Sequence, residues 1–480
     1  MSFCGSAHVH FMGICGSGCA SIAMIAARAG YKVTGCDQST DSYYAKELKK
    51  LGIEIHEGHN REHLTEDVDF VAVSPALFDI SPDEPELLLA KERGILMTWQ
   101  EFMGKYLQKD KKVIAVSGTH GKTTTTFMTA ELLIGGKLDP TVEGGSVYKK
   151  WGNGGRYGEG EIFLCEADEF NRNFLNYHPE IAAVNNAEMD HPECFRDFDD
   201  MIDAYVSFLT GSRNLKTVIL NADSEGAMEV LGKALDEPRV QAARKILYTR
   251  DRERTSDDTK TEIVFYESTE KTKDGTAFRF TDRDGVHEFR MKLYGEYNVS
   301  NAVTASLIAR AAGLSDEVIA ESLLSFSGVG RRFDYVGDFS GIPVFDDYAH
   351  HPTEIKSVLT MCREYFGDRK VTAVFEPHQV SRLTLMFDRY VDALNIADHV
   401  IIMKTHLGRE IHKGVRPIPE ETWKAASPKM LYEEEYESIR GALLKLIEQD
   451  ECGIIVVIGA ANSYRISQAL AAEGKTANGK

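Results

Sequence analysis

Short apolar runs alternate with helix-like patterns along the first hundred residues. Residues 9–12 and 70–73 are apolar runs of strand length, and residues 20–29 have the spacing of a helix that Gly30 would end. Strands that alternate with amphipathic helices are typical of a parallel sheet with crossover helices. We therefore expect a Rossmann-like α/β unit at the start of the chain.

The same alternation continues in two further segments. In the middle of the chain, strands are expected at 113–116, 162–165, 181–184 and 217–220, and alternating stretches at 262–267, 277–280 and 286–293. The turn residues before 286 indicate a β-meander appended to the α/β core. After Gly330, strands are expected at 344–345, 371–375, 399–403 and 453–458. The sequence thus predicts an α/β chain of three domains, with limits at 1–110, 111–327 and 328–480.

Composition narrows the class of protein. The 480 residues are 43% hydrophobic and 27% charged, with a net charge of −19. That charge disfavours nonspecific binding to nucleic acid or to an anionic membrane. We find no apolar window of about 18 residues and no basic segment followed by an apolar one at the N-terminus. The eight cysteines form no Cys-x-x-Cys pair, so neither a disulfide framework nor a zinc site is indicated. We expect a cytoplasmic enzyme, and no oligomeric state follows from the sequence.

The most informative motif is a glycine loop that joins an apolar strand to a helix. Residues 117–124 read Ser-Gly-Thr-His-Gly-Lys-Thr-Thr. Backbone amides of such a loop can surround phosphate oxygens, Lys122 can neutralise terminal phosphate charge, and Thr123 can hold Mg²⁺. Val116 stands where the usual pattern has its first glycine. A tight strand-to-helix turn is the alternative, and the flanking strand and helix favour nucleotide binding.

A second glycine turn follows the first strand. Gly13, Gly16 and Gly18 have the spacing G-x-x-G-x-G, and Asp37 lies about 20 residues further on, where it could hold a ribose hydroxyl. The turn is compatible with a redox cofactor, with a nucleotide-linked substrate or with simple packing. Because a separate triphosphate loop is present, we favour the nucleotide-linked substrate.

Acidic residues follow two of the central strands. Glu166, Asp168 and Glu169 come after residues 162–165, and Asp190-His191 follows residues 181–184. In a parallel sheet these strand ends share the edge that holds the phosphate loop. Carboxylates and an imidazole there could complete the coordination of Mg²⁺, although helix capping is an equal alternative for any one of them.

The order of these motifs resembles the Mur ligases of bacterial cell-wall synthesis. The resemblance covers nearly the whole chain and includes residues 118–124, 166–169, 190–191, 295–301, 331–334, 346–354 and 375–378. The segments 10–14, 346–354 and 375–378 are most similar to the branch that acts on UDP-N-acetylmuramate. Tyr297 stands where the family commonly has His, and Gln379 where it often has Arg.

The resemblance implies an ATP-dependent amide-bond ligase that uses Mg²⁺ and passes through an acyl phosphate. The ATP site would comprise Gly118, Thr119, His120, Gly121, Lys122, Thr123, Thr124, Asn298, Asn301, Arg332 and Asp347. Lys122 and Arg332 would contact phosphates, the two asparagines adenine, and Asp347 the ribose. Thr123, Glu166 and His191 would support the metal, and Lys122, Glu166, His191 and Arg332 would be catalytic.

The resemblance also implies where the other substrates bind. The UDP part would contact Gly13, Gly16, Gly18, Asp37 and Ser74, and the incoming amine would lie near Tyr348, His350, His378 and Arg382. The amine is expected to be L-alanine, with an L-alanyl-γ-D-glutamyl-meso-diaminopimelate tripeptide as the alternative. A P-loop switch would need neither the glycine turn nor the third domain. A nicotinamide oxidoreductase would leave the phosphate loop unexplained.

Overall fold

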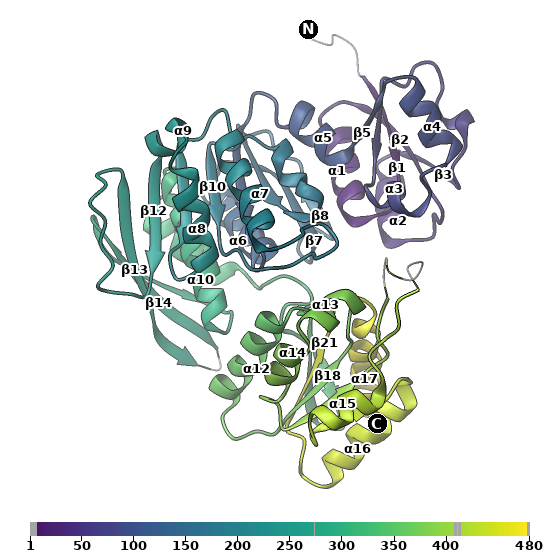
Figure 1. The fold of residues 1–480 in the computed structure, drawn as a ribbon, viewed down its shortest axis with the longest axis vertical. Helices are drawn as coiled ribbons and strands as arrows, with labels where there is room; N and C mark the ends of the chain where they lie inside the picture. Colours follow the sequence, from purple (N-terminus) through teal and green to yellow (C-terminus); the bar gives the residue numbers. More distant parts are fainter. Residues whose placement is uncertain (1–6, 273, 408–409, 411–413, 478–480) are drawn as a thin grey trace.

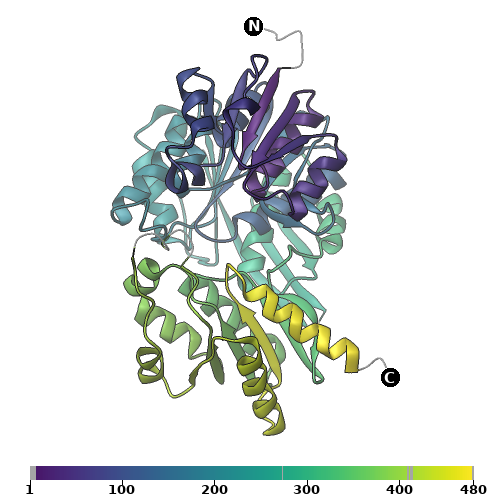
Figure 2. The ribbon, with the colours of Figure 1, turned by 90° about the vertical axis from the view of Figure 1, so that its right-hand side faces the viewer.

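The computed structural model describes residues 7–272, 274–407, 410 and 414–477, which form three bodies, each built on its own sheet. The C-terminal body lies below the other two in both views (Figures 1 and 2). The predicted three-part α/β architecture is confirmed. The sheets span residues 8–98, 112–291 and 334–458, and the domain limits at 110 and 327 stay predictions. Among the described residues, none of the helices combines the length and apolar character needed to span a bilayer.

The N-terminal body is a five-stranded parallel sheet in the order β3-β2-β1-β4-β5. Its elements are β1 (His8–Met12), α1 (Ser17–Arg28), β2 (Lys32–Asp37), α2 (Tyr43–Lys50), β3 (Glu54–Glu57), η1 (Arg61–His63), β4 (Phe70–Val73), α3 (Ala76–Ile80), α4 (Pro85–Glu92), β5 (Leu96–Thr98), α5 (Trp99–Phe102) and η2 (Met103–Leu107). One face of β1 packs on α1 through Val9 and Phe11. The opposite face of the sheet, with Met12 of β1 and Cys36 of β2, packs on a smaller core that includes Leu87 of α4.

The central body is a ten-stranded sheet in the order β15-β14-β13-β12-β11-β10-β6-β9-β7-β8. Its strands are β6 (Lys112–Ser117), β7 (Thr141–Tyr148), β8 (Asn153–Arg156), β9 (Ile162–Ala167), β10 (Ile181–Val184), β11 (Thr217–Asn221), β12 (Arg244–Thr249), β13 (Thr261–Thr272), β14 (Gly275–Asp282) and β15 (Gly285–Met291). Its helices are α6 (Lys122–Gly135), η3 (Phe170–Asn176), α7 (Phe198–Gly211), α8 (Glu225–Ala234), α9 (Pro238–Ala242), α10 (Glu296–Ala311) and α11 (Asp316–Ser325). The expected meander is present, and it continues the sheet because β13 pairs in parallel with β12.

The C-terminal body is a six-stranded sheet in the order β16-β17-β21-β18-β19-β20, parallel except for β16. Its strands are β16 (Asp334–Phe339), β17 (Ile342–Asp347), β18 (Val371–Phe375), β19 (His399–Ile402), β20 (Met430–Tyr432) and β21 (Ile454–Ile458). Its helices are α12 (Pro352–Phe366), α13 (Val380–Leu385), α14 (Phe387–Leu394), α15 (Glu420–Ala426), α16 (Tyr436–Glu448) and α17 (Ser463–Ala477).

Strand order in the central sheet explains why distant sequence motifs meet. β6 lies between β10 and β9, and all three run in parallel. Their carboxyl ends therefore release the glycine loop, the acidic cluster and the segment 185–191 at one edge of the sheet. The helix α6 that follows the loop is buried on nearly every residue, which fixes the loop against a rigid support.

The segment 185–191 is held in place by a close backbone contact with α8. A Cβ atom added at Gly226 would lie 2.0 Å from the carbonyl oxygen of Ala187, whereas one added at Gly232 of the same helix would meet nothing within 4 Å. Alanine favours a helix over glycine by about 1 kcal/mol, but a backbone oxygen this close cannot give way. The first glycine is therefore required by packing and the second is not.

We expect Gly226→Ala to lower the free energy of unfolding by about 2 kcal/mol, because the overpacking outweighs the gain in helix propensity. The matched change Gly232→Ala should raise it by about 0.5–1 kcal/mol. Thermal unfolding of both variants measures the difference. Equal melting temperatures for the two would contradict the contact with Ala187.

Candidate active site

The glycine loop between β6 and α6 is shaped by one asparagine. Gly121 has φ +79°, and a Cβ atom there would lie 2.4 Å from Oδ1 of Asn301. Thr125 donates a hydrogen bond to the same oxygen over 3.1 Å. Within the described chain no side chain caps the start of α6, so the first amides of this helix face outward and can bind an anion.

Lys122 is surrounded by carboxylates. Its Nζ donates to Oε2 of Glu169 over 2.8 Å and lies 3.5 Å from Oδ1 of Asp168. Burial alone would lower the pKa of Lys122, but the charges of Glu169, Asp168 and Glu166 outweigh it and raise the pKa. The ammonium group is therefore charged and held at the mouth of the loop.

The carboxylates outnumber this single cation. Burial raises the pKa of Glu166 and of Glu169. Burial, together with the charges of Glu166 and Asp168, raises the pKa of Glu143 well above its ordinary value. Oε1 of Glu169 is buried and has no hydrogen-bond partner among the described residues. An excess of buried acidic oxygens, one of them unpartnered, fits a hard divalent cation.

The structure divides the three predicted metal ligands into two groups. Oγ1 of Thr123 donates to Oε1 of Glu166 over 3.1 Å. His191 instead groups with Asp168 and Glu169, whose ligand atoms and its own all lie within 4.8 Å of one another. The set of Thr123, Glu166 and His191 stays a prediction, and the geometry adds two carboxylates that were not in it.

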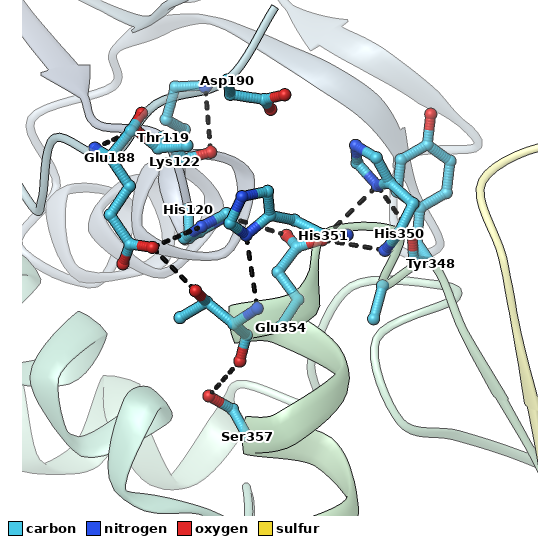
Figure 3. Close-up of polar contacts among 12 residues, drawn as sticks. Thr119, His120, Lys122, Glu188, Asp190, Tyr348, His350, His351, Glu354 and Ser357 are labelled. Atoms are coloured by element: carbon cyan, nitrogen blue, oxygen red, sulfur yellow. Dashed lines mark hydrogen bonds and ion pairs between the residues drawn. The ribbon is translucent and has the colours of Figure 1, made fainter. Parts of the chain in front are cut away.

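His120 lies between the central and C-terminal bodies. Figure 3 shows its ring between Glu188 and Glu354. Nδ1 is 3.4 Å from Oε1 of Glu354, and Nε2 is 3.9 Å from Oε2 of Glu188. Burial would lower the pKa of His120, but the two carboxylates outweigh it and raise the pKa to about 9. The imidazole is therefore protonated at neutral pH.

The side chain of Glu354, at the N-terminus of α12, makes several contacts. Its Oε2 accepts the backbone N–H groups of His350 over 3.0 Å and His351 over 3.3 Å, and the latter contact is half of a capping box. Its Oε1 faces His120 and lies 3.5 Å from Nη1 of Arg332. One capping residue thus joins the phosphate loop to the corner that carries Arg332.

Residues from all three bodies line one cavity of about 790 Å³. The predicted site residues that line it include Gly18, Ser74, Thr119, Gly121, Lys122, Thr123, Glu166, His191, Arg332, Tyr348 and His350. A neighbouring cavity of about 460 Å³ lies between the central and C-terminal bodies and is lined by His120, Gly121, Thr124, Asn301, Arg332 and Asp347, among others. Arg332 borders both cavities and also lies over the ring of Tyr348, with its Cζ atom 5.2 Å from the ring centroid.

Three predicted contact residues are engaged with the protein's own backbone. Asp37 accepts the N–H of Cys15 over 2.9 Å and so holds the glycine turn. Nδ2 of Asn298 donates to the carbonyl of Tyr294 over 2.8 Å. Asp347 accepts two backbone N–H groups, each over 2.7 Å. These side chains shape the site, and a direct role toward a ligand stays a prediction for each.

The remaining predicted residues are not among the lining residues of either cavity. Gly13 and Gly16 face each other in the turn, where the N–H of Gly16 donates to the carbonyl of Gly13 over 3.1 Å. Gly118 packs against Asn185 and Asn186. Nε of Arg382 lies 2.9 Å from Oδ1 of Asp190, with both side chains buried, and the ring of His378 is 6.2 Å from that of His350.

Sequence reasoning missed several residues of the site. Arg250 and Tyr266 line the smaller cavity from the β12–β13 region, where only a loop and an alternating strand were expected. Glu354 lies in the segment 346–354 but no role was expected for it, and Glu188, two residues before Asp190, was not expected in the site. A capping residue three positions into a helix gives no signal that its second oxygen faces another domain.

Comparison with known proteins is consistent across the chain. Family models match residues 8–111 (Mur ligase family, catalytic domain), 116–309 (Mur ligase middle domain) and 331–463 (Mur ligase, glutamate ligase domain). A UDP-N-acetylmuramate–L-alanine ligase of Brucella ovis is 34% identical and covers 97% of this chain and 98% of its own. The UDP-N-acetylmuramate–L-alanine ligase of Bradyrhizobium diazoefficiens is 35% identical and covers 84% of this chain and 83% of its own.

Solved structures have the same fold. The UDP-N-acetylmuramate-alanine ligase of Thermotoga maritima matches with a TM-score of 0.75 at 23% identity, over 98% of this chain and 99% of its own. A murein peptide ligase of Psychrobacter arcticus matches with a TM-score of 0.67 at 23% identity, over 99% of both chains. Three family models match in chain order, and relatives with 34–35% identical residues cover most of the chain. The chain therefore belongs to the Mur ligase family.

Proposed function

We propose that the chain joins L-alanine to the lactyl carboxylate of UDP-N-acetylmuramate, consuming ATP and releasing ADP and phosphate. The observation that carries the proposal is the 790 Å³ cavity, in which the phosphate loop, the turn region of the first body and Arg332 of the third all face one space. A ligase must bring three substrates together, and this cavity has walls from three bodies. The names of the relatives at 34–35% identity support the same reaction.

Phosphoryl transfer needs positioning and charge neutralisation more than a protein nucleophile. The free amides at the start of α6 would hold the phosphates of ATP. Lys122 would exchange Glu169 for a terminal phosphate oxygen, and Arg332 would approach from the opposite wall. Each of these groups would stabilise charge that develops as the lactyl carboxylate attacks the γ-phosphorus and becomes an acyl phosphate.

The acidic cluster at the loop fits Mg²⁺. Glu166, Asp168 and Glu169 would hold the ion together with Thr123, and His191 lies beside them. When bound, Mg²⁺ supplies positive charge to the phosphoryl oxygens. Released from their contacts with Lys122, the carboxylates would keep that ion in place while the ammonium group turns to the triphosphate.

The sugar nucleotide would bind at the start of α1. Gly16 caps this helix without a side-chain hydrogen bond in the described structure, so its amides can receive a pyrophosphate. A Cβ atom at Gly18 would lie 2.7 Å from the ring of Trp99, which explains the need for glycine on this wall. Ser74 borders the same cavity.

The incoming amine would bind beside Tyr348 and His350. Burial lowers the pKa of His350 to about 4 and that of His378 to about 3, so both imidazoles are neutral at neutral pH and do not repel an ammonium substrate. The competing acceptor is the L-alanyl-γ-D-glutamyl-meso-diaminopimelate tripeptide, and the relatives at 34–35% identity, which are named as L-alanine ligases, favour alanine. We place the reaction in the cytoplasm, where ATP and the sugar nucleotide are made.

The central and C-terminal bodies are held together at the site by polar contacts. Besides the His120–Glu354 pair, Thr353 donates to Glu188 over 2.7 Å. We propose that binding of ATP and the sugar nucleotide strengthens this closed arrangement, with the third body moving away between turnovers.

We expect phosphate release only when UDP-N-acetylmuramate and an acceptor amine are both present with ATP. A panel of L-alanine, L-serine, glycine and the tripeptide measures acceptor choice, and L-alanine should give the highest kcat/KM. Faster release with the tripeptide would replace alanine addition by peptide recycling. Release without the sugar nucleotide would contradict a ligase altogether.

Lys122→Ala should reduce kcat by about 10²–10³-fold while the protein stays folded, because it removes charge stabilisation from the transition state. Lys112→Ala, at an exposed lysine that begins the same strand, is the matched control and should be near normal. Steady-state phosphate release and circular dichroism of both variants test this. Near-normal turnover of the first variant would refute the assigned role of the loop.

His120→Gln should lower stability in a pH-dependent way. The pKa of His120 is raised from 6.5 to about 9, so its protonated form stabilises the fold by about 3 kcal/mol. This contribution is complete below pH 6.5 and is lost as the pH rises through 9. Thermal unfolding should therefore separate wild type from variant at pH 7 and bring them together near pH 10. An equal difference at both pH values would contradict the ion pair with Glu354.

A further inference from the structure

A second cluster of metal-binding side chains lies in the N-terminal body, away from the glycine loop. His10 of β1, Cys36 of β2, His63 of η1 and Glu86 of α4 each offer one ligand atom, and these four atoms all lie within 4.8 Å of one another. His10, Cys36 and Glu86 are fully buried, and the side chain of His63 is 13% exposed.

The distances within the cluster are near those between ligands of one ion, and the Glu86–His10 distance is the one that is shorter than a tetrahedral site gives. Oε1 of Glu86 lies 3.0 Å from Nε2 of His10 and 3.3 Å from Nδ1 of His63. Sγ of Cys36 lies 3.4 Å from Nε2 of His10. Bond lengths of about 2.0–2.3 Å in a tetrahedral zinc site place neighbouring ligand atoms roughly 3.3–3.8 Å apart.

Two of the atoms approach each other without forming a hydrogen bond. Oε1 of Glu86 and Nδ1 of His63 are both buried, and neither has a hydrogen-bond partner within the described part of the chain. Buried polar atoms are normally paired, because leaving one unpaired costs about 1–3 kcal/mol. A buried carboxylate oxygen and a buried imidazole nitrogen that are unpaired and only 3.3 Å apart leave two donor atoms available to one cation.

We propose that His10, Cys36, His63 and Glu86 bind a divalent cation of the zinc class. One thiolate, two imidazoles and one carboxylate make a complete tetrahedral donor set of borderline softness, which suits Zn²⁺ better than Mg²⁺ or Ca²⁺. Four protein ligands leave no open position, so the site is structural. Binding releases the proton of the Cys36 thiol to solvent.

Neighbouring groups orient these ligands. Nδ1 of His10 is 2.9 Å from Oγ1 of Thr34, which leaves Nε2 for the cation. The backbone N–H of Asn60 donates to Oε2 of Glu86 over 2.9 Å. Such outer contacts fix the tautomer and orientation of metal ligands. Nδ1 of His59, 3.0 Å from Sγ of Cys36, is a further neighbour of the thiol.

The position of the cluster indicates that a bound cation would stabilise the N-terminal body. The core on this face of the sheet is the small one around Met12 and Leu87, so a cation would join β1, β2, η1 and α4 where little apolar surface is buried. The carbonyl of Cys36 accepts the N–H groups of Gly13 over 2.9 Å and Ile14 over 3.2 Å. Fixing Cys36 therefore also fixes the glycine turn.

The first test is the metal content of the purified full-length protein. We expect about one zinc per chain by mass spectrometry of the metals. After removal with a chelator, titration with Co²⁺ should give a thiolate-to-cobalt charge-transfer band and tetrahedral d–d bands, and adding Zn²⁺ should abolish them and raise the melting temperature. A wild-type protein that binds neither ion stoichiometrically, with no change in melting temperature, would overturn the proposal and leave a proton-sharing network of buried side chains.

Variants assign the ligands. Cys36→Ser should remove the charge-transfer band, and Cys452→Ser, at a buried cysteine of the C-terminal body, should keep it. His63→Asn should weaken Co²⁺ binding at least tenfold, whereas His56→Asn should leave it unchanged, because His56 stacks on His63 with ring centroids 4.4 Å apart and is not a ligand. Retention of the band in Cys36→Ser, or equal effects of the two histidine changes, would contradict the assignment even if one variant folds poorly.

Discussion

The arrangement of the site depends on how charge is balanced around one short loop. Residues 118–122 carry two cations, His120 and Lys122, whose side chains are only 14% and 11% exposed, and an unpaired charge at such a position is costly. Lys122 is balanced from within its own body by Glu169 and Asp168, and His120 is balanced both by Glu188 of its own body and, across the interface, by Glu354. The charge balance of the loop therefore depends on residues outside its own body. The third body contributes one of the two carboxylates that keep the imidazole of the loop charged.

Much of the fold could be predicted from the sequence because its signals are local. An apolar run followed by Gly-x-x-Gly-Lys-Thr predicted β6, the loop and the start of α6, and parallel topology then predicted that Glu166, Asp168 and His191 would meet there. Short strands such as β3 and β5 were missed, because Glu54–Glu57 and Leu96–Thr98 are too brief for periodicity to separate them from loops.

The rest could not be predicted, because it depends on which residues meet across long separations. Asp37 was expected at a ribose, and in the structure it holds the N–H of Cys15. The absence of a Cys-x-x-Cys pair was taken as evidence against zinc. The cluster of His10, Cys36, His63 and Glu86 draws its ligands from four separate elements, so no spacing rule for a continuous motif would have found it.

The ion pairs between the central and C-terminal bodies differ in length. Nδ1 of His120 and Oε1 of Glu354 are 3.4 Å apart, whereas Nε of Arg382 and Oδ1 of Asp190 are 2.9 Å apart, against about 2.7–2.9 Å for a strong charge-assisted hydrogen bond. For the proposed reaction, the strength of the contact between His120 and Glu354 sets a compromise between product release and the exclusion of water. Tighter pairs would lengthen the residence of ADP and product, while looser ones would admit water to the acyl phosphate and waste ATP. In the proposed reaction, the length of the ion pair between His120 and Glu354 would therefore affect both the rate of turnover and the loss of ATP to hydrolysis.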